Sequence, residues 1–501
     1  MASRPRIGLA LSGGGFRAAA FHLGVLKRLD ELRVLPQISL LSTVSGGSIT
    51  GALYALRCRE EGDGSPGSYP IDALITDLRH TLRSNLRGQA LFGSPFRVLR
   101  AVTSFAVPAV ARMPLIVREL ERLYRGASIS RLPSWIVINA TNLVTGKNWK
   151  FFADRAGDYA IGATADTASI TIAQAVGASA AYPVLVDPYP FVTRWEQLRA
   201  DLIDDRWEQP AGNGAAAGSW RERFGRATGR VTLPLVDGGI YDNEGLNALR
   251  GAKTTHAIVS SVDPAESSYL GNWGLLRLLR VVEVMHSRLG AVTRQHAYEM
   301  THGASPNAVR EALNSLATTL DGTDADHPLN AREMRKLARV GLPPRGHQFT
   351  ALAPILLHRT DLVRNWSAAY DEPYDIPPDL RGVPETVLHE LSRVRTDLDA
   401  LEDGVFNLLM AQAYFLTDAH LKVSMPEILE SGSLKPDWAL AREMIKSSQD
   451  KTQSTVKLLR IAQRRSLLGR MGSIKQAARV WVSLVLTAVI FVVVVIAVAV
   501  R

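Results

Sequence analysis

Three short glycine-rich segments carry the residue types that acyl-transfer chemistry needs. They are Gly13-Gly14-Gly15, Ser45-Gly46-Gly47 and Asp237-Gly238-Gly239, and each directly follows an apolar run. A serine hydroxyl can act as a nucleophile, a carboxylate can take its proton, and glycine amides can stabilise an oxyanion. The three segments therefore predict a hydrolytic site, provided that the fold brings them together.

The serine of the second segment has the setting of an activated nucleophile. The stretch Thr43-Val44-Ser45-Gly46-Gly47 is close to the Gly-x-Ser-x-Gly elbow, with threonine at the first small position. Glycines beside such a serine tolerate the strained backbone that exposes its hydroxyl. The alternative interpretation is a Ser/Gly-rich turn that only begins the next helix, with Ser48 as its N-cap.

The first glycine segment suits an anion. In Gly13-Gly14-Gly15-Phe16-Arg17-Ala18 the glycines lie between a strand and a helix, so their N–H groups can converge at the positive end of that helix. The spacing also fits a dinucleotide-binding fingerprint, but the second strand ends in Thr-Val-Ser without the acid that this fingerprint requires. A P-loop is excluded, because no Gly-Lys-Ser/Thr follows. We expect an oxyanion hole formed by Gly13, Gly14, Gly15 and Gly46.

The aspartate of the third segment is the candidate base. Asp237 follows the apolar run VTLPLV, and burial at the end of a strand raises the basicity of a carboxylate. Asp242 lies in the same turn and is its rival, and Asp-Gly-Gly can also be a simple turn. No histidine lies in a glycine-rich turn, so we expect a Ser45–Asp237 dyad, with His22 as a weaker candidate for lining the site.

These segments need a scaffold of alternating strands and helices. Apolar strands at 6–11 and 38–44 alternate with helically spaced stretches at 16–32 and 49–61, which predicts parallel strands joined by right-handed crossovers. We expect the sheet to fill roughly the first half of the chain and helices the rest. Further strands are expected at 135–143, just before Asp237 and at 256–263, and the first of these turns at Gly146 into a partner, Asn-Trp-Lys-Phe-Phe-Ala. Further helices are expected between 71 and 124, just before Tyr182 and Pro183, and at 275–296, 307–320 and 384–420. A mobile insert is expected at 209–219.

The order of these motifs resembles that of the patatin-like phospholipase family, including its bacterial members. The resemblance covers most of residues 6 to about 260 and implies an α/β fold, a three-layer αβα sandwich around a mostly parallel sheet. Two small residues depart from the family pattern, because Ala18 and Thr43 stand where glycine is usual. The stretches that carry the resemblance are LALSGGGFRAAAFHLGVLKRL, TVSGGSITGAL, INATNLVTGKNWKF, ASAAYPVL and LVDGGIYDNEGL, with a weaker likeness in DLDALEDGVFNLLMAQAYFLTDAHL.

The resemblance also implies a chemistry. Ser45 matches the family's nucleophile and Asp237 its base, and the activity implied is hydrolysis of acyl esters in lipids, of phospholipase A or lysophospholipase type, through an acyl-enzyme. No metal or cofactor is implied, and the chain has no Cys/His cluster that would hold zinc. Two alternatives stay open: a membrane-anchored scaffold or pseudoenzyme with the same fold, and an esterase acting on small esters. The residues that match the family's supporting positions are Arg17, Gly47, Gly238 and Gly239.

The composition is that of a globular chain with a basic balance. Hydrophobic residues make up 46% and charged residues 21% of the 501 positions, and the net charge is +10. Such a charge suits anionic membranes or nucleic acid and does not by itself choose between them. The single cysteine, Cys58, excludes an intrachain disulfide and fits a reducing compartment.

The C-terminal region favours the membrane. Residues 480–500 contain no charge, and as a helix they would span roughly 30 Å, the thickness of a bilayer's hydrocarbon core. A buried helix or strand is the alternative. The preceding tract 451–479 is basic and contains no acid, which predicts contact with anionic lipid, a cytoplasmic catalytic body and no nucleic-acid partner. The expected organisation is a catalytic core at 5–265, a helical extension packing on it at 266–430, a basic linker at 431–479 and a transmembrane helix at 480–500.

Overall fold

The computed structural model of the chain describes its N-terminal half almost continuously and its C-terminal half in pieces. The expected insert at 209–219, the helix at 307–320 and most of the apolar segment 480–500 lie outside the described residues. The described residues are 5–92, 94–98, 113–183, 186–204, 207, 229–262, 351–356, 383–394, 398–429 and 436–463, with short helical pieces within 281–293 and 478–489.

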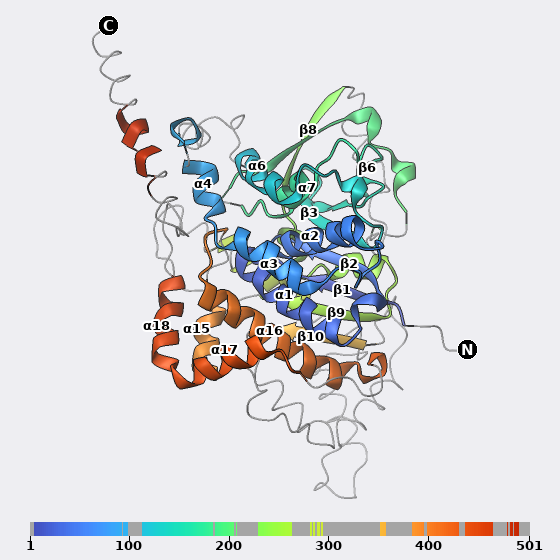
Figure 1. Ribbon diagram of the computed structural model, residues 1–501. Helices are drawn as coiled ribbons and strands as arrows, with labels where there is room; N and C mark the ends of the chain where they lie inside the picture. Colours follow the sequence, from blue (N-terminus) through green and yellow to red (C-terminus); the bar gives the residue numbers. More distant parts are fainter. Residues whose placement is uncertain are drawn as a thin grey trace, which may run out of the picture.

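A ten-stranded sheet organises the fold, in the order β10-β9-β1-β2-β3-β4-β5-β6 with β7 and β8 attached through β3 (Figure 1). Its centre is parallel, as predicted, and antiparallel strands extend one side of it. The parallel strands are β1 (Ile7–Leu11), β2 (Ile38–Val44), β3 (Ile136–Asn142), β9 (His256–Ser261) and β10 (Ala351–Leu356). The antiparallel strands are β4 (Lys147–Phe151), β5 (Ala156–Asp158), β6 (Gly162–Thr164), β7 (Tyr189–Arg194) and β8 (Arg230–Asp237).

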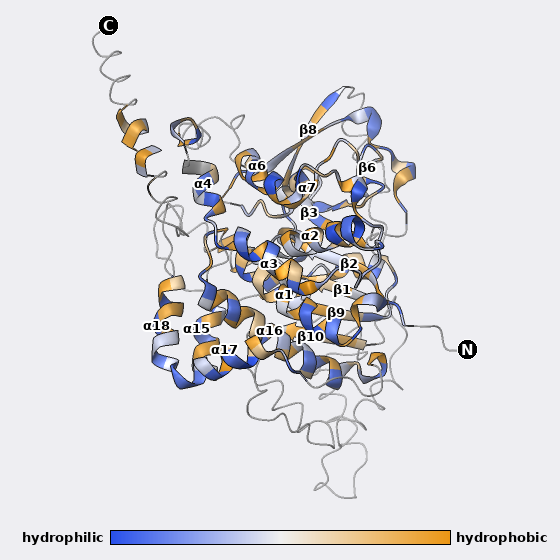
Figure 2. Ribbon diagram, in the orientation of Figure 1, coloured by the Kyte–Doolittle hydropathy of each residue, from blue (hydrophilic) through white to orange (hydrophobic). Residues whose placement is uncertain are grey.

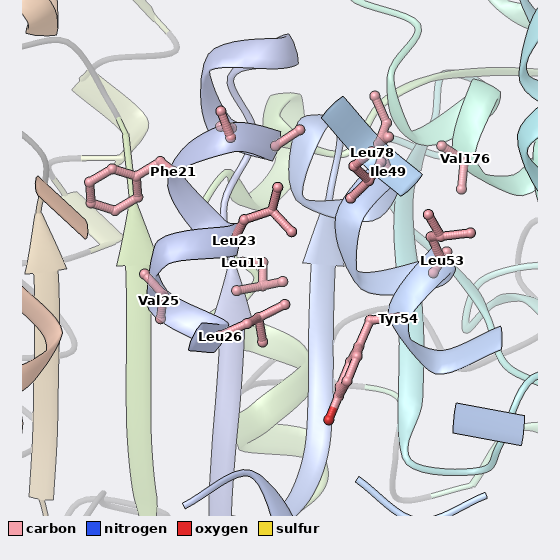
Figure 3. Packing of buried hydrophobic residues seen from close by; sticks show 14 of the residues in the cluster. Leu11, Phe21, Leu23, Val25, Leu26, Ile49, Leu53, Tyr54, Leu78 and Val176 are labelled. Carbon is pink, nitrogen blue, oxygen red and sulfur yellow. The ribbon is translucent and has the colours of Figure 1, made fainter. Parts of the chain in front are cut away.

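Helices lie on both faces of this sheet, and the alternation of side chains along β1 shows why. Leu9 and Leu11 belong to the core under α1 (Gly15–Glu31) and α2 (Gly46–Glu61), whereas Ala10 belongs to a second core with α10 (Leu246–Gly251). Successive residues of a strand point to opposite faces, so apolar side chains at consecutive positions require cover on both sides. Figure 3 shows Leu23 and Leu26 of α1 beside Leu11 of β1, and Leu53 of α2 near Val176.

The remaining helices match the expected ones in part. The helix expected at 49–61 already begins at Gly46, the one expected to end near Tyr182 ends at Ser179, and the stretch 384–420 forms two helices rather than one. The other α-helices are α3 (Ile71–Leu82), α4 (Leu86–Phe92), α6 (Met113–Tyr124), α7 (Ile172–Ser179), α9 (Gly239–Asp242), α15 (Glu385–Ser392), α16 (Asp403–Ser424), α17 (Ala439–Asp450) and α18 (Thr452–Gln463). Of the helices now given, α10, α17 and α18 were not expected. Short 3₁₀ turns lie at Leu35–Gln37, Ile129–Arg131, Trp195–Gln197, Ala200–Leu202 and Pro426–Ile428.

The sheet also reaches beyond the half of the chain in which it was expected. Strand β10 comes from residues 351–356 and pairs in parallel with β9 at the edge of the sheet. Its sequence contains Pro354, which removes a backbone donor and is tolerated mainly in edge strands. The expectation that helices alone follow the first half is therefore wrong at this strand.

Helix α16 is part of the core rather than a separate layer of chain. It lies beside α1 and contacts β10 (Figure 1). Gly24 of α1 permits this approach, since a Cβ there would clash with the backbone carbonyl of Met410. The guanidinium of the fully buried Arg28 donates to Asp418 Oδ1, at 2.8 Å from Nη2, so the two helices also share a buried ion pair.

Part of the basic tract is folded as well. Arg460 of α18 pairs with Glu390 of α15 at 3.0 Å, and Gln463 donates to the same carboxylate. Further on, the described pieces around 481–489 are helical and coloured as hydrophobic in Figure 2. Trp481 and Val485 there are more than half exposed. Among the helices that the structure describes, none combines the length and apolar character needed to cross a bilayer.

Candidate active site

Ser45 occupies the tight turn between β2 and α2 and is held in an unusual backbone conformation. Its φ is 50° and its ψ is −115°. The other non-glycine residues with positive φ in the described chain, Arg33, Arg125 and Lys253, each follow the end of a helix, whereas Ser45 precedes one. Its side chain makes no capping bond to α2. A strained serine between a strand and a helix is the geometry of a nucleophile elbow.

The residues after Ser45 must be glycines because α2 begins against the backbone of the first glycine loop. A Cβ on Gly46 would clash with the carbonyl of Gly15, and a Cβ on Gly47 with the carbonyl of Leu11. Ser48 lies inside α2, so the interpretation of Ser48 as its N-cap is wrong.

Thr43, which lies on β2 and departs from the family pattern, is accommodated by Gly51 of α2. Its methyl group would stand 2.5 Å from a Cβ on Gly51, and its hydroxyl donates to the Val137 carbonyl at 3.1 Å. Ala18 fits for a similar reason, because its neighbour Gly14 has no side chain at the point of closest approach. Both departures are therefore compatible with the turns in which they lie.

Strands β2 and β8 end next to each other on one edge of β3. Residues 140–142 of β3 pair with β4 on one edge and with β8 on the other, and this second edge is the one that β2 occupies up to Asn139. Val44 is opposite Asn139, and Asp237 is opposite the next residue, Ala140. Since adjacent strand residues are about 3.3 Å apart along a strand, Ser45 and Asp237 leave their strands at the same place.

A hydrogen-bonded residue from α7 joins these two strand ends. The N–H of Ser45 donates to Ser179 Oγ at 2.8 Å, and the N–H of Gly238 donates to the Ser179 carbonyl at 3.2 Å. The Cβ positions of Gly13 and Gly238 would lie 3.6 and 3.2 Å from the same methyl group of Val44. The three glycine-rich segments predicted from the sequence therefore converge around the end of β2.

The two candidate aspartates differ in the hydrogen bonds that their carboxylates accept. Asp242 accepts the N–H of Gly245 through Oδ1 at 3.1 Å and the N–H of Asn247 through Oδ2 at 2.7 Å. Both of its oxygens therefore accept backbone N–H groups at the start of α10. Asp237 is 3% exposed and accepts the N–H of Gly239 through Oδ1 at 2.8 Å. Asp237 ends its strand beside Ser45, whereas Asp242 lies at the end of the following helical turn, so the geometry favours Asp237 as the base.

The glycine loop presents two helix N-termini to Ser45. Gly15 and Gly46 are the first residues of α1 and α2, where backbone N–H groups have no acceptor within their own helix. Gly14 and Gly15 have φ of 135° and 58°, values that a glycine adopts without strain. The N–H of Gly13 instead donates to the Asn243 carbonyl at 3.2 Å. Gly13 therefore shapes the loop, and the amides of Gly14, Gly15 and Gly46 are the better oxyanion donors.

Arg17 and His22 lie on α1, which follows the glycine loop, and both side chains are buried. The guanidinium of Arg17 is 1% exposed and donates to the carbonyls of Ser392 at 2.7 Å and Val394 at 3.0 Å, at the end of α15. It tethers the C-terminal region to the loop instead of reaching toward a substrate.

His22 fixes the last residue before the glycines. Its Nε2 lies 3.0 Å from the Ser12 carbonyl, which can only accept, so Nε2–H is the donor and Nδ1 accepts from the Ser260 hydroxyl at 2.7 Å. Complete burial lowers the pKa of the imidazole to about 4, although the hydrogen bond to Ser12 acts in the opposite direction. His22 is therefore neutral at pH 7 and does not line the site.

Two residues around the dyad were not singled out from the sequence. Asn139 donates through Nδ2 to the carbonyl of Thr43 at 3.0 Å, and Ser179 links the two strand ends. Both lie in stretches that carry the family resemblance, but neither has a neighbouring glycine or charge to mark it. In the part of the chain that is described, no group of three His, Cys, Asp or Glu side chains could hold a metal ion.

Fold and site together define an α/β protein with a strained serine on a strand-to-helix turn beside the end of an aspartate-bearing strand. The model of the Patatin-like phospholipase family matches residues 9–250, which contain all three glycine-rich segments and amount to just under half of the chain. This match supports the family predicted from the sequence and, with it, a lipid ester hydrolase. No curated protein matches the chain.

Three solved structures show remote likeness. Human GIVD cytosolic phospholipase A2 is 12% identical, with a TM-score of 0.38 over 91% of this chain and 60% of that one. VipD from Legionella pneumophila is 13% identical, with a TM-score of 0.26 over 93% and 94% of the two chains. ExoU from Pseudomonas aeruginosa, in complex with SpcU, is 16% identical, with a TM-score of 0.19 over 92% and 91%. At these values none of the three carries an argument about function.

Proposed function

We propose that this protein is a lipid acyl hydrolase of phospholipase A or lysophospholipase type, with Ser45 as nucleophile and Asp237 as base. The observation that carries the proposal is the meeting of β2 and β8 on β3, which sets the strained Ser45 beside the end of the strand that carries Asp237. The family match over residues 9–250 supports the substrate class.

In the proposed reaction, the Asp237 carboxylate takes the proton of Ser45 Oγ as this oxygen attacks the ester carbonyl. The tetrahedral intermediate collapses when the carbonyl–alkoxy bond breaks, and the leaving alcohol takes the proton back from Asp237. Water then attacks the acyl-enzyme, with Asp237 accepting its proton, and the fatty acid leaves as Ser45 regains its hydrogen. No redox partner is needed, since each step only moves a proton and exchanges one C–O bond for another.

The negative charge of the intermediate would develop beside the N-termini of α1 and α2. A Cβ on Gly46 would stand 2.8 Å from the N atom of Gly15, so these two first-turn amides lie close together. Two helix N-termini supply both hydrogen-bond donors and a favourable dipole for an anion. Removing one such donor typically costs about 3 kcal/mol of transition-state stabilisation.

We further propose that residues 480–500 anchor the protein to a membrane, with the catalytic body in the cytoplasm. The support is the absence of charge in this segment and the basic residues before it. The described part also exposes apolar side chains, among them Trp481, Val485 and, on the helical turn at 95–98, Phe96. Thr487 donates to the carbonyl of Pro95 at 3.4 Å, so this helical turn and the C-terminal helical piece lie together.

In the scaffold alternative, the helical second half, residues 275–420, could supply a binding surface. Most of the described side chains of α16 are buried, and the helix packs against α1, α17 and β10, so little of it is exposed to a partner. The observation favours a role for α16 in supporting the core.

Digestion of phospholipid vesicles tests the proposal. The wild-type protein should release fatty acid, and Ser45→Ala and Asp237→Asn should both abolish release while keeping the wild-type melting temperature. A chain-length series of esters then separates a lipid hydrolase from an esterase that prefers small substrates. Equal release by wild type and Ser45→Ala would contradict the proposal, and absence of release by all three would favour a pseudoenzyme.

A further inference from the structure

Ser179 is the last residue of α7 and lies between the two strand ends that carry the proposed dyad. The helix begins at Thr171 with a capping box, in which Thr171 accepts the N–H of Gln174, and it packs on β3 and β8. Ser179 is fully buried. A buried hydroxyl needs a polar partner, and those of Ser179 come from the site.

Two hydrogen bonds connect Ser179 to the dyad segments, and a third connects it to β3. Its Oγ accepts the N–H of Ser45 at 2.8 Å and donates to the carbonyl of Asn139 at 2.6 Å, while its own carbonyl accepts the N–H of Gly238. Ser179 therefore holds the backbone of the proposed nucleophile, the β3 residue opposite Val44 and the residue that follows Asp237.

The hydroxyl protons of this cluster leave one arrangement for Ser179. The carbonyls of Val137 and Asn139 can only accept, so they take the protons of Thr43 and Ser179 respectively. Ser48 Oγ lies 3.1 Å from Thr43 Oγ1 and 2.9 Å from Ser179 Oγ, and its one proton can be donated to either of these oxygens. The lone pairs of Ser179 Oγ are thus available to accept the N–H of Ser45.

This bond matters because Ser45 has a backbone conformation that a serine does not favour. A residue with φ of 50° and ψ of −115° persists only when its surroundings fix it. The N–H that Ser45 directs at Ser179 is buried, so without an oxygen at residue 179 it would lose its acceptor. The turn could then relax and move Oγ of Ser45 away from Asp237.

We propose that Ser179 is a positioning residue that fixes Ser45 and the Asp237 turn in one reactive arrangement. The inference rests on the proposed function, because it assigns Ser179 a role in the same dyad. Its side chain acts through the backbone of Ser45 and does not touch the substrate.

The test compares Ser179→Ala with Thr50→Ala. Thr50 is a matched control, since it is a fully buried hydroxyl on α2 that donates to the Ala19 carbonyl at 3.0 Å, on α1 and not on a dyad segment. The measurement is the rate at which a long-chain alkyl fluorophosphonate labels each protein, together with the final number of labels per chain.

Ser179→Ala should label roughly 10- to 100-fold more slowly than wild type and still reach one label per chain, because the nucleophile is present but misplaced. With a soluble ester, kcat should fall by a similar factor while KM stays within about twofold. Thr50→Ala should label at the wild-type rate. Ser179→Thr keeps the oxygen and should recover most of the rate.

The outcomes separate the inference from the function on which it rests. A wild-type rate in Ser179→Ala, or an equal loss in Thr50→Ala, would overturn the role of Ser179 alone. A lower number of labels at an unchanged rate would mean that Ser179 only stabilises the fold, and it would also overturn the inference. No labelling of folded wild-type protein would overturn the proposed function and this inference with it.

Discussion

Val44 and Asp237 lie opposite consecutive residues on the same edge of strand β3. One strand arrives parallel to β3 and the other antiparallel to it, so their ends meet head to head. The residue after Val44 is Ser45, and the glycine loop before α1 packs against the same strand end. The arrangement gives the proposed nucleophile and base a common support, from which the following predictions are derived.

Asp237 and Asp242 should respond differently to loss of charge. In Asp237→Asn we expect hydrolysis to fall by 10²-fold or more, since the proposed base is removed. In Asp242→Asn, one oxygen becomes an NH2 group that cannot accept its backbone N–H and the other accepts without a charge, so unfolding should become easier by about 1.5–3 kcal/mol while activity per folded molecule persists. Urea unfolding and fatty-acid release measure the two effects. Loss of activity only in Asp242→Asn would mean that Asp242 is the base and Asp237 is structural.

The close contact between α1 and α16 predicts a large cost for one methyl group. Gly24→Ala places a Cβ against the Met410 carbonyl, which cannot turn away, so we expect about 1–3 kcal/mol of destabilisation. Gly404→Ala is the matched control on α16, because its Cβ would meet only the end of the Leu458 side chain at 2.9 Å. Thermal unfolding should show a lower melting temperature for the first variant only. Equal melting temperatures would contradict the packing of α16 on α1.

His22 should make stability depend on pH in the mildly acidic range. Its pKa is about 4 in the folded protein and 6.5 when exposed. Between these values the unfolded chain binds a proton that the folded chain does not, so stability falls as the pH drops from 6.5 to 4. The full difference corresponds to roughly 3 kcal/mol.

A variant without the imidazole isolates this effect. The free energy of unfolding should decline less between pH 7 and pH 4.5 in His22→Gln than in wild type, as measured by urea titration at each pH. His389, on α15, provides the control substitution because it lies outside this network. Identical pH profiles for wild type and His22→Gln would mean that His22 does not carry the dependence.

The C-terminal segment should govern attachment to membranes rather than chemistry. A chain lacking residues 480–500 should no longer sediment with phosphatidylcholine vesicles, whereas its rate on a soluble short-chain ester should equal that of the full chain. Adding phosphatidylserine should recover part of the binding through the basic residues before the segment, and this recovery should vanish at high salt. Full sedimentation of the shortened chain in phosphatidylcholine would contradict the proposed anchor.

Local patterns in the sequence predict the strands and turns of the site well. Strand β2 ends at Val44 and β8 ends at Asp237, both as expected. An apolar run followed by Ser-Gly-Gly or Asp-Gly-Gly is typical of a strand that ends in a tight turn. The convergence of these ends is not a local property, since it depends on the register of both strands against β3. The roles of Ser45 and Asp237 in catalysis remain predictions.

Other features depend on partners that are distant in the chain. β10 is a short apolar run whose strand character comes from pairing with β9, and nothing within residues 351–356 distinguishes it from a loop. In the sequence, Ser179 is indistinguishable from any small residue at the end of a helix, because its role depends on the N–H of Ser45, which is distant in the chain. The position of Arg17 is similar, because its acceptors at Ser392 and Val394 come from the other end of the chain.

The most direct test of the central claim is to map where a long-chain fluorophosphonate binds covalently. Peptide mass analysis of the full-length protein should place a single phosphonyl group on Ser45, and both Ser45→Ala and Asp237→Asn should remain unlabelled over the same time. A label on any other residue, or a folded wild-type protein that takes up no label, would contradict the assignment of Ser45 and Asp237 as a catalytic pair.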